Sequence, residues 1–538
     1  MDRATGDSKV DWREWGAEPF EYAAVADRPV LLSLSAPWCT SCLEMDAETY
    51  SEPRIAARVG DGFVPVRVDV DRRPRVRDRY NAGGFPTATF LAPDGTVIAA
   101  AGYLDPDGMR DTLDRVEERW AEAGSDAGTV PRVLEAADPP ADDVTDGIEA
   151  ALTGRLVETY DPEHGGWGDG AKFPTPRTVE FALKREREQA TRTLDAIRAN
   201  LQDEDGGFFR YAAEPDWSRP SREKLLDANA ALVRAFANAY LSTGADAYRE
   251  AAERAIEYLT STLWTGEAFA GSERPDDDGG ADDPAAGAPQ RIDPTAFADR
   301  NGAAVDALLT YHAYTDDERA REYAVRALTF LRSDLLEDGV PIHYRDGDEA
   351  GPRGLLGDAA GVLAALTTAR EVLGADVLDD ARTLADATID RLGDDRGFVD
   401  GPTEDSGLLD RPLRPIDDNY EMAAALLDLH ALSGVDRYRA AARDAIGAVA
   451  GARDRMGVQL AGYGSVAARL VGPALRIDVG TPAGSDLHRA ALRVGDHEKV
   501  VVPAVEDLDG TARVVVGDAE SDPAASPAAL ADRVADLV

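Results

Sequence analysis

The feature that most constrains the fold of this chain is a pair of cysteines, Cys39 and Cys42, which directly follow an apolar run. The run Pro29–Ser35 is typical of a buried strand, and a helix is expected to begin at the cysteines. The sequence holds two cysteines in all, which excludes a disulfide scaffold and a four-cysteine metal site. Because a helix N-terminus favours the thiolate, this Cys-x-x-Cys spacing predicts redox chemistry.

The elements around the cysteines follow the order of a thioredoxin fold. Strands are predicted at 63–70, 84–91 and 96–101, and a closing helix at 107–121. This is a β-α-β half followed by a β-β-α half. A zinc half-site or an inert cysteine pair is the alternative interpretation.

Three further residues are predicted to support the cysteines. Trp38 precedes the pair and is expected to cover it with a flat apolar surface. In thioredoxin-like proteins a cis-proline lies opposite the cysteines, and Phe85-Pro86 has the matching position. The alternative is a trans-proline that begins an edge strand. Cys39 is the predicted nucleophile and Cys42 the residue that resolves a mixed disulfide.

From residue 147 to 472 the pattern changes to one amphipathic helix after another, which predicts a stacked or toroidal α/α architecture. Predicted helices include 177–200, 222–242, 295–314, 357–373 and 419–432. Equivalent loops are expected at one rim, because Gly165-Gly166-Trp167, Gly206-Gly207-Phe208 and Gly397-Phe398 each follow an acidic stretch.

The predicted domains are a thioredoxin-like domain at 1–123, a linker at 124–146, an all-α toroid at 147–472 and a small α/β segment at 473–538. In the last segment, strands are expected at 475–479, 499–503 and 512–516, and a helix at 527–537. The stretch 271–290, dense in Asp, Gly, Ala and Pro, is predicted to be an insertion.

The charge balance is extreme, with 101 acidic and 58 basic side chains and a net charge of −43. Because this excess is spread along the whole chain, it indicates adaptation to a salt-loaded cytoplasm, as in a halophile. An acidic binder of basic partners is the alternative. Nucleic-acid binding is disfavoured, and no apolar run is long enough for a bilayer, so a cytoplasmic protein without membrane partners is expected.

A wider resemblance appears in the flanking motifs. Asp11-Trp12-Arg13-Glu14-Trp15-Gly16, the segment 160–168 and Ala171-Lys172-Phe173-Pro174 resemble the thioredoxin-fused, spermatogenesis-associated family. The helical part of that family is similar to six-hairpin glycosidases and sugar epimerases, which implies an (α/α)6 toroid. The chain departs from the pattern at Ser33, where thioredoxins carry a buried acid, and at Ser221-Arg222-Glu223-Lys224-Leu225, where the family has His-Phe-Glu-Lys-Met.

Six residues form the candidate site of the toroid, and each also has a purely structural interpretation. Carboxylates for glycoside chemistry, a proton carrier and an aromatic platform would come from this set. The two lysines stand out because arginine supplies nearly all positive charge, so each is expected to pair with a buried acid. The set is Asp161, His164, Trp167, Lys172, Glu223 and Lys224. No cofactor and no metal site are predicted.

Three functions are compatible with these patterns. The leading hypothesis is a thiol–disulfide oxidoreductase that acts on protein thiols or disulfides, fused to a carbohydrate-enzyme-like toroid. The second is a carbohydrate-active hydrolase or epimerase with a regulatory thioredoxin domain. The third is a non-catalytic scaffold that binds proteins.

Overall fold

The computed structural model describes residues 8–135, 140–275 and 291–538, and it divides into two compact units. Unit 1 comprises Met1–Asp138, Ser272–Asp293 and Gly401–Leu413, and unit 2 comprises the rest. The predicted insertion lies outside the described residues from position 276 to 290. Within the described ranges, no helix combines the length and apolarity that a membrane span requires.

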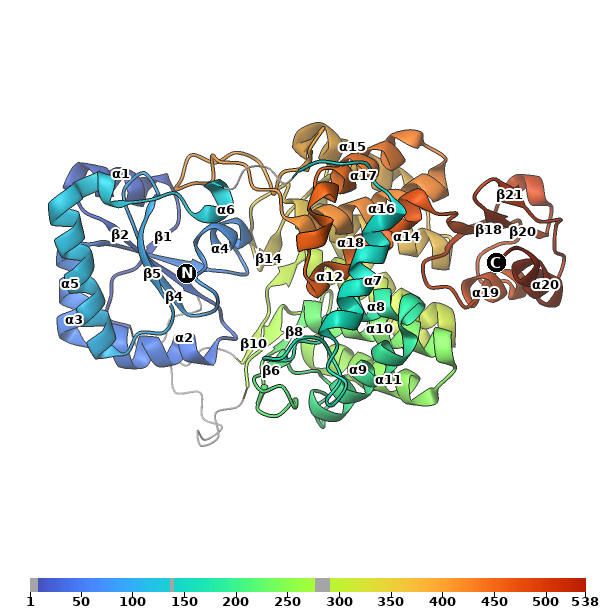
Figure 1. The fold of residues 1–538 in the computed structure, drawn as a ribbon, viewed down its shortest axis with the longest axis horizontal. Helices are drawn as coiled ribbons and strands as arrows, with labels where there is room; N and C mark the ends of the chain where they lie inside the picture. The colour runs from blue at the N-terminus through green and yellow to red at the C-terminus, as the bar shows by residue number, and fades with distance from the viewer. Residues whose placement is uncertain (1–7, 136–139, 276–290) are drawn as a thin grey trace. The chain divides into compact units, whose positions relative to one another are not determined.

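Unit 1 is built on a five-stranded sheet in the order β1-β3-β2-β4-β5 (Figure 1). Strands β1, β3 and β2 run parallel, while β4 and β5 are antiparallel to their neighbours, which confirms the predicted thioredoxin-like order. The strands are β1 (Arg13–Glu14), β2 (Val30–Ser35), β3 (Val64–Asp69), β4 (Thr87–Leu91) and β5 (Val97–Ala101). The helices are α1 (Ala17–Ala26), α2 (Thr40–Met45), η1 (Asp46–Tyr50), α3 (Pro53–Gly62), α4 (Pro74–Tyr80), α5 (Pro106–Ala123), η2 (Gly124–Ala127) and α6 (Arg132–Glu135).

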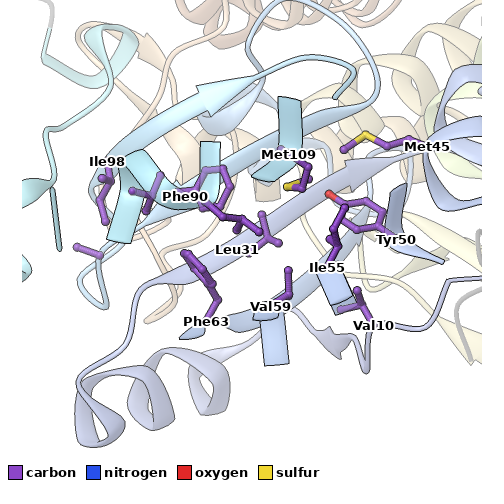
Figure 2. Close-up of a cluster of buried hydrophobic side chains, with 14 of the residues drawn as sticks. Val10, Leu31, Met45, Tyr50, Ile55, Val59, Phe63, Phe90, Ile98 and Met109 are labelled. Carbon is purple, nitrogen blue, oxygen red and sulfur yellow. The ribbon is translucent and has the colours of Figure 1, made fainter. Parts of the chain in front are cut away.

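A hydrophobic core joins the sheet to α3 and α5. Leu31 and Phe90 project from the sheet toward Val59 of α3 and Met109 of α5, and each of these four side chains is fully buried (Figure 2). Burial of a side chain of this size contributes about 1.5–3 kcal/mol, so the core fixes the end of β2 from which the cysteines follow.

A distant segment of the sequence completes unit 1. Gly401–Leu413 packs on α4, where the Tyr80 hydroxyl accepts a 2.9 Å hydrogen bond from the Leu408 N–H. Arg79 donates to the Leu408 carbonyl at 3.0 Å, and the Trp15 indole donates to the Ser406 hydroxyl at 3.1 Å. This tether joins residues more than three hundred positions apart, and no local pattern in the sequence predicts it.

The helices of unit 2 pair into an inner ring and an outer layer, which confirms the predicted toroid. Neighbouring inner helices contact one another in a closed ring: α8 (Pro176–Arg185), α10 (Leu226–Thr243), α12 (Ala298–Thr315), α14 (Leu356–Leu373), α16 (Ile416–Ser433) and α18 (Ala461–Val471). Each inner helix packs on one outer helix, drawn from α9 (Arg187–Asn200), α11 (Asp246–Tyr258) with η3 (Leu259–Leu263), α13 (Glu318–Asp334), α15 (Leu378–Leu392), α17 (Asp436–Gly447) and α7 (Asp146–Thr159). The remaining 3-10 turns are η4 (Ala450–Arg455) and η5 (Val458–Leu460).

The ring closes where the last inner helix meets the first outer helix. Gly464 of α18 faces Leu152 of α7, and a Cβ added to this glycine would lie 2.9 Å from Leu152 Cδ1 and 2.8 Å from Phe181 Cε2. Because both distances are shorter than van der Waals contact, a glycine is required for this approach.

Two helix predictions need correction. The predicted single helix 177–200 is two helices, α8 and α9, because Glu186 leaves the helical region with φ −136° and ψ 60°. The flanking residues are all good helix formers, so packing in the ring overrides local propensity. Helix α18 was not among the predicted helices, although it is needed to close the ring.

One face of the ring carries short turns and the other carries long loops. The turns after α10, α14 and α16 close on Gly244, Gly374 and Gly434 in the left-handed conformation, where glycine is least strained. The long loops precede the inner helices and contain short strands: β6 (Tyr211–Ala212), β7 (Pro220–Ser221), β8 (Lys224–Leu225), β11 (Ala296–Phe297), β12 (Leu336–Glu337), β13 (Val340–Pro341), β14 (Tyr344–Asp346), β15 (Glu349–Ala350), β16 (Gly393–Asp394) and β17 (Gly397–Phe398). The pair β9 (Ser272–Glu273) and β10 (Ile292–Asp293) belongs to unit 1.

Two of the three predicted Gly-aromatic loops are held by a repeated asparagine contact, whereas in the third, Gly165-Gly166-Trp167, the Gly166 N–H donates to the Thr193 hydroxyl at 3.0 Å. The side chain of Asn229 accepts a hydrogen bond from the Phe208 N–H and donates to the Phe208 carbonyl, at 2.7 and 3.1 Å. The same exchange recurs between Asn419 and Phe398. It recurs a third time between Asn301 and a phenylalanine that was not in the predicted repeat, Phe269. These loops are therefore equivalent, and each is fastened to the first turn of an inner helix.

The C-terminal segment folds into a small α/β module. Its sheet has the order β19-β18-β20-β21, and the predicted strands and helix are confirmed. Its elements are β18 (Leu475–Val479), α19 (Asp486–Leu492), β19 (Val500–Pro503), η6 (Glu506–Leu508), β20 (Ala512–Val516), β21 (Ala519–Glu520) and α20 (Pro527–Leu537). The module is fastened to α14, where the Val501 N–H donates to Glu371 Oε2 at 2.9 Å.

Candidate functional site

The two cysteines form a disulfide at the start of the helix that follows β2. Their Cα atoms lie 5.3 Å apart, and both residues are only 4% exposed. Cys39 is the N-cap residue of α2, and its Sγ accepts a hydrogen bond from the Cys42 N–H at 3.1 Å. An N–H group aimed at this sulfur favours its anionic form after reduction, as the sequence analysis predicts for Cys39.

Trp38, Phe85 and Pro86 are the three residues predicted to support the cysteine pair. Phe85 packs edge-on to Trp38 with ring centroids 5.9 Å apart, and the Phe85–Pro86 peptide bond is cis. Sequence reasoning missed Asp71, whose Oδ2 accepts a 2.7 Å hydrogen bond from the Trp38 indole. A buried acid two residues past the end of β3 is the signal that could have identified this partner.

The buried acid beside the redox helix is Asp46 rather than a residue at position 33. Asp46 follows α2 directly, its N–H donates to the Cys42 carbonyl, and its carboxylate makes a bidentate ion pair with Arg67 of β3. Both side chains are almost fully buried. The ion pair therefore joins the residue that follows α2 to strand β3.

Among the six predicted toroid residues, three meet in the first long loop. Lys172 Nζ donates to Asp161 Oδ2 at 2.9 Å and to the Gly168 carbonyl at 2.7 Å, while His164 Nδ1 lies 3.3 Å from the same carboxylate. Burial raises the pKa of Asp161, but hydrogen bonds from Lys172 and from the His164 backbone outweigh it and hold this pKa below its ordinary value. Trp167 packs in the same loop against Tyr160.

The other predicted residues lie in the second long loop. Lys224 Nζ donates to Asp203 Oδ2 at 2.7 Å and Asp205 Oδ2 at 2.6 Å. Burial raises the pKa of Asp203, but the Lys224 hydrogen bond lowers it by more. Glu223 accepts from the Ser221 hydroxyl in the same loop. Each lysine pairs with acids of its own loop, but Asp203 and Asp205, the partners of Lys224, have side chains that are 35% and 39% exposed rather than buried. The six residues lie in two separate loops.

The comparisons with known proteins agree with this geometry. The thioredoxin-like DsbH family, described as a protein of unknown function, DUF255, matches residues 3–133. Residues 3–133 are a thioredoxin-like domain of this family. This domain is also similar to thiol:disulfide interchange protein DsbD 1 of Pseudomonas aeruginosa, with 33% identity over 104 residues that cover 18% of this chain and 17% of the relative.

A longer match extends into the helical unit. The chain is homologous to spermatogenesis-associated protein 20 of Homo sapiens, with 27% identity over 292 residues that cover 47% of this chain. The matched region spans 37% of the length of that relative. Among solved structures, a sugar epimerase from a ruminal bacterium is similar at a TM-score of 0.47 and 14% identity, covering 56% of this chain and 84% of that one.

Sequence reasoning missed the interior of the toroid, which holds a charged cavity of about 180 Å³. Arg234 donates to Glu180 at 2.8 and 2.9 Å and to Asp306 at 2.6 Å. Burial raises the pKa of Glu371 to about 8 and lowers that of Lys499 to about 8. Charged residues inside the apolar runs of the inner helices, such as Asp306 within Ala-Val-Asp-Ala-Leu, are the signal that could have revealed this cavity.

Proposed function

We propose that this chain catalyses thiol–disulfide exchange through Cys39 and Cys42, with protein thiols or disulfides as its partners. The observation that carries the proposal is the Cys42 N–H hydrogen bond to Cys39 Sγ in a thioredoxin-like sheet. It stabilises the charge that Cys39 bears as nucleophile or leaving group.

The reaction needs no group beyond the two cysteines and a partner disulfide. The Cys39 thiolate attacks one sulfur of the partner and releases the other as a thiolate, which forms a mixed disulfide. Cys42 then attacks Cys39 Sγ, so that the partner leaves as a dithiol and the Cys39–Cys42 disulfide observed here remains. Trp38, which directly precedes Cys39, packs edge-on against Phe85.

The first test is a redox titration of the pair with thiol alkylation. Because the sequence contains two cysteines, a reduced chain gains two alkyl adducts and a chain with the disulfide gains none. A reduction potential near about −270 mV indicates a reductase of the thioredoxin kind. A pair that never forms a disulfide in solution contradicts the proposal.

The second test is insulin reduction by single variants. Cys39→Ser is expected to remove activity, whereas Cys42→Ser is expected to accumulate mixed disulfides because the resolving thiol is lost. Ser41→Ala, at the exposed position between the cysteines, is the matched control and is expected to keep the wild-type rate. Unchanged insulin reduction in both cysteine variants contradicts the proposal.

A carbohydrate activity of the toroid stays a prediction. Turnover within a panel of sugars, lost on Asp161→Asn or Glu223→Gln, would support it. The hydrogen bonds of Lys172 and Lys224 favour a structural role for these two lysines, since each closes its own loop.

A further inference from the structure

A second cluster of reactive side chains lies on the long-loop face of unit 2. Asp299 stands in the first turn of α12, Asp358 in the first turn of α14, and His343 between β13 and β14. One ligand atom from each residue lies within 4.8 Å of the others. Among the residues that the structure describes, these three form the one group of at least three His, Cys, Asp or Glu side chains with this spacing. The outermost of the three residues, Asp299 and Asp358, are 59 positions apart along the sequence, so the ring of helices assembles the cluster.

The imidazole of this cluster is held rigidly. His343 Nδ1 lies 2.8 and 3.1 Å from the two carboxylate oxygens of Asp358, and both side chains are almost fully buried. The backbone of His343 is fixed on two sides, because its carbonyl accepts from the Ala298 N–H and its N–H donates to the Pro352 carbonyl, each at 2.8 Å. Asp299 is the partly exposed member.

The cluster brings two carboxylates to one place, because one oxygen of Asp299 and one of Asp358 lie within 4.8 Å of each other and of a His343 ring nitrogen. Arg300, the residue after Asp299, donates to the Gly271 carbonyl at 3.2 Å, and its guanidinium lies 4.5 Å from the Phe297 ring centre. Two carboxylates at one buried place are costly unless a proton or a metal ion lies between them.

We propose that Asp299, His343 and Asp358 bind one divalent transition-metal ion. Two carboxylates and one imidazole are a mixed oxygen and nitrogen donor set, which suits Mn²⁺, Fe²⁺ or Zn²⁺.

The cluster belongs to unit 2 and the cysteines to unit 1, and metal binding is expected to be unchanged in Cys39→Ser.

The test uses the full chain, stripped with EDTA and desalted into about 1 M KCl, which screens weak binding to surface acids. Mn²⁺, Zn²⁺ and Co²⁺ are titrated by calorimetry, and bound metal is counted after gel filtration. One ion per chain is expected, together with visible Co²⁺ absorption. Asp299→Asn and His343→Gln are each expected to lower the affinity at least about tenfold.

His312→Gln is the matched control, since His312 Nδ1 contacts the Asp317 carbonyl outside the cluster. Circular dichroism checks that each variant is folded. If the buried His343 variant unfolds, Asp299→Asn decides, because its side chain is partly exposed. A wild-type chain that retains no metal overturns the proposal, and so does a folded Asp299→Asn variant that binds as tightly as the wild type.

Discussion

The indole of Trp38 donates a 2.7 Å hydrogen bond to Oδ2 of Asp71, and both residues are buried. The bond fixes the aromatic side chain that precedes Cys39 in the sequence. For the thiol–disulfide exchange proposed above, Asp71 is a positioning residue.

Trp38→Phe is expected to slow insulin reduction and to destabilise the chain by about 1–3 kcal/mol, because the Asp71 carboxylate loses a donor while it stays buried. Urea unfolding and initial rates measure the two effects. Trp120→Phe is the control, since its 3.3 Å bond to the Asp27 carbonyl is exposed. Equal losses of insulin-reduction rate and of stability in Trp38→Phe and Trp120→Phe would contradict a positioning role for Asp71.

The ion pair of Asp46 and Arg67 is expected to be a large contributor to the stability of unit 1. Asp46→Ala leaves the Arg67 charge buried without its carboxylate partner and should cost about 3–5 kcal/mol by denaturant unfolding. Asp107→Ala removes an exposed partner of Arg110 and should cost less than about 1 kcal/mol.

The asparagine contacts of the rim loops give a third prediction. Asn301→Ala should destabilise unit 2 by at least about 2 kcal/mol, because the buried N–H and carbonyl of Phe269 lose their partners. Asn229→Ala should behave alike, since its contacts are equivalent. Asn200→Ala, at an exposed position, is the control. Thermal unfolding that shows no difference between the buried and exposed variants would contradict this assignment.

Glu371 gives a prediction of pH dependence. Burial, followed by the charge of Asp428, raises its pKa from 4.5 to about 8. The folded chain therefore binds this proton more tightly than the unfolded chain, and the free energy of unfolding falls as pH rises from 4.5 to about 8.

Glu371→Gln cannot ionise, so its stability relative to the wild type should increase with pH by a few kcal/mol across this window. Denaturant unfolding at several pH values measures the difference. Glu318→Gln, whose side chain is 74% exposed, is the control. A difference that stays constant with pH would show that Glu371 is ionised throughout.

The net charge of −43 predicts a response to salt. Repulsion between acids is screened within about 3 Å at 1 M salt, so the melting temperature should rise steadily between dilute and molar KCl. Differential scanning calorimetry measures the rise. A melting temperature that is independent of KCl would favour the alternative of an acidic binder of basic partners.

Local patterns predicted much of this fold. The Cys-x-x-Cys after an apolar strand, the Phe85–Pro86 bond and the Gly-aromatic loops depend on neighbouring residues, and the structure contains each of them. The strands at 475–479 and 512–516 were predicted for the same reason.

The features that sequence reasoning missed depend on distant contacts. Glu186 interrupts a helix between residues that all favour one, and Asp46 is buried in an ion pair with Arg67 of β3. The cluster of Asp299, His343 and Asp358 exists only because two inner helices and a loop meet. Nothing in the spacing of such residues along the chain indicates their proximity.

The contact between Gly464 and Leu152 determines when the toroid can finish folding. The two residues are roughly three hundred positions apart, so the loop-closure entropy of nearly the whole unit must be overcome before they meet. During synthesis α7 is made before α18. The apolar face of α7 that α18 covers therefore stays exposed until α18 has been made. The ring is therefore closed by its last inner helix. A nascent chain that ends before that helix exposes apolar surface to chaperones and proteases.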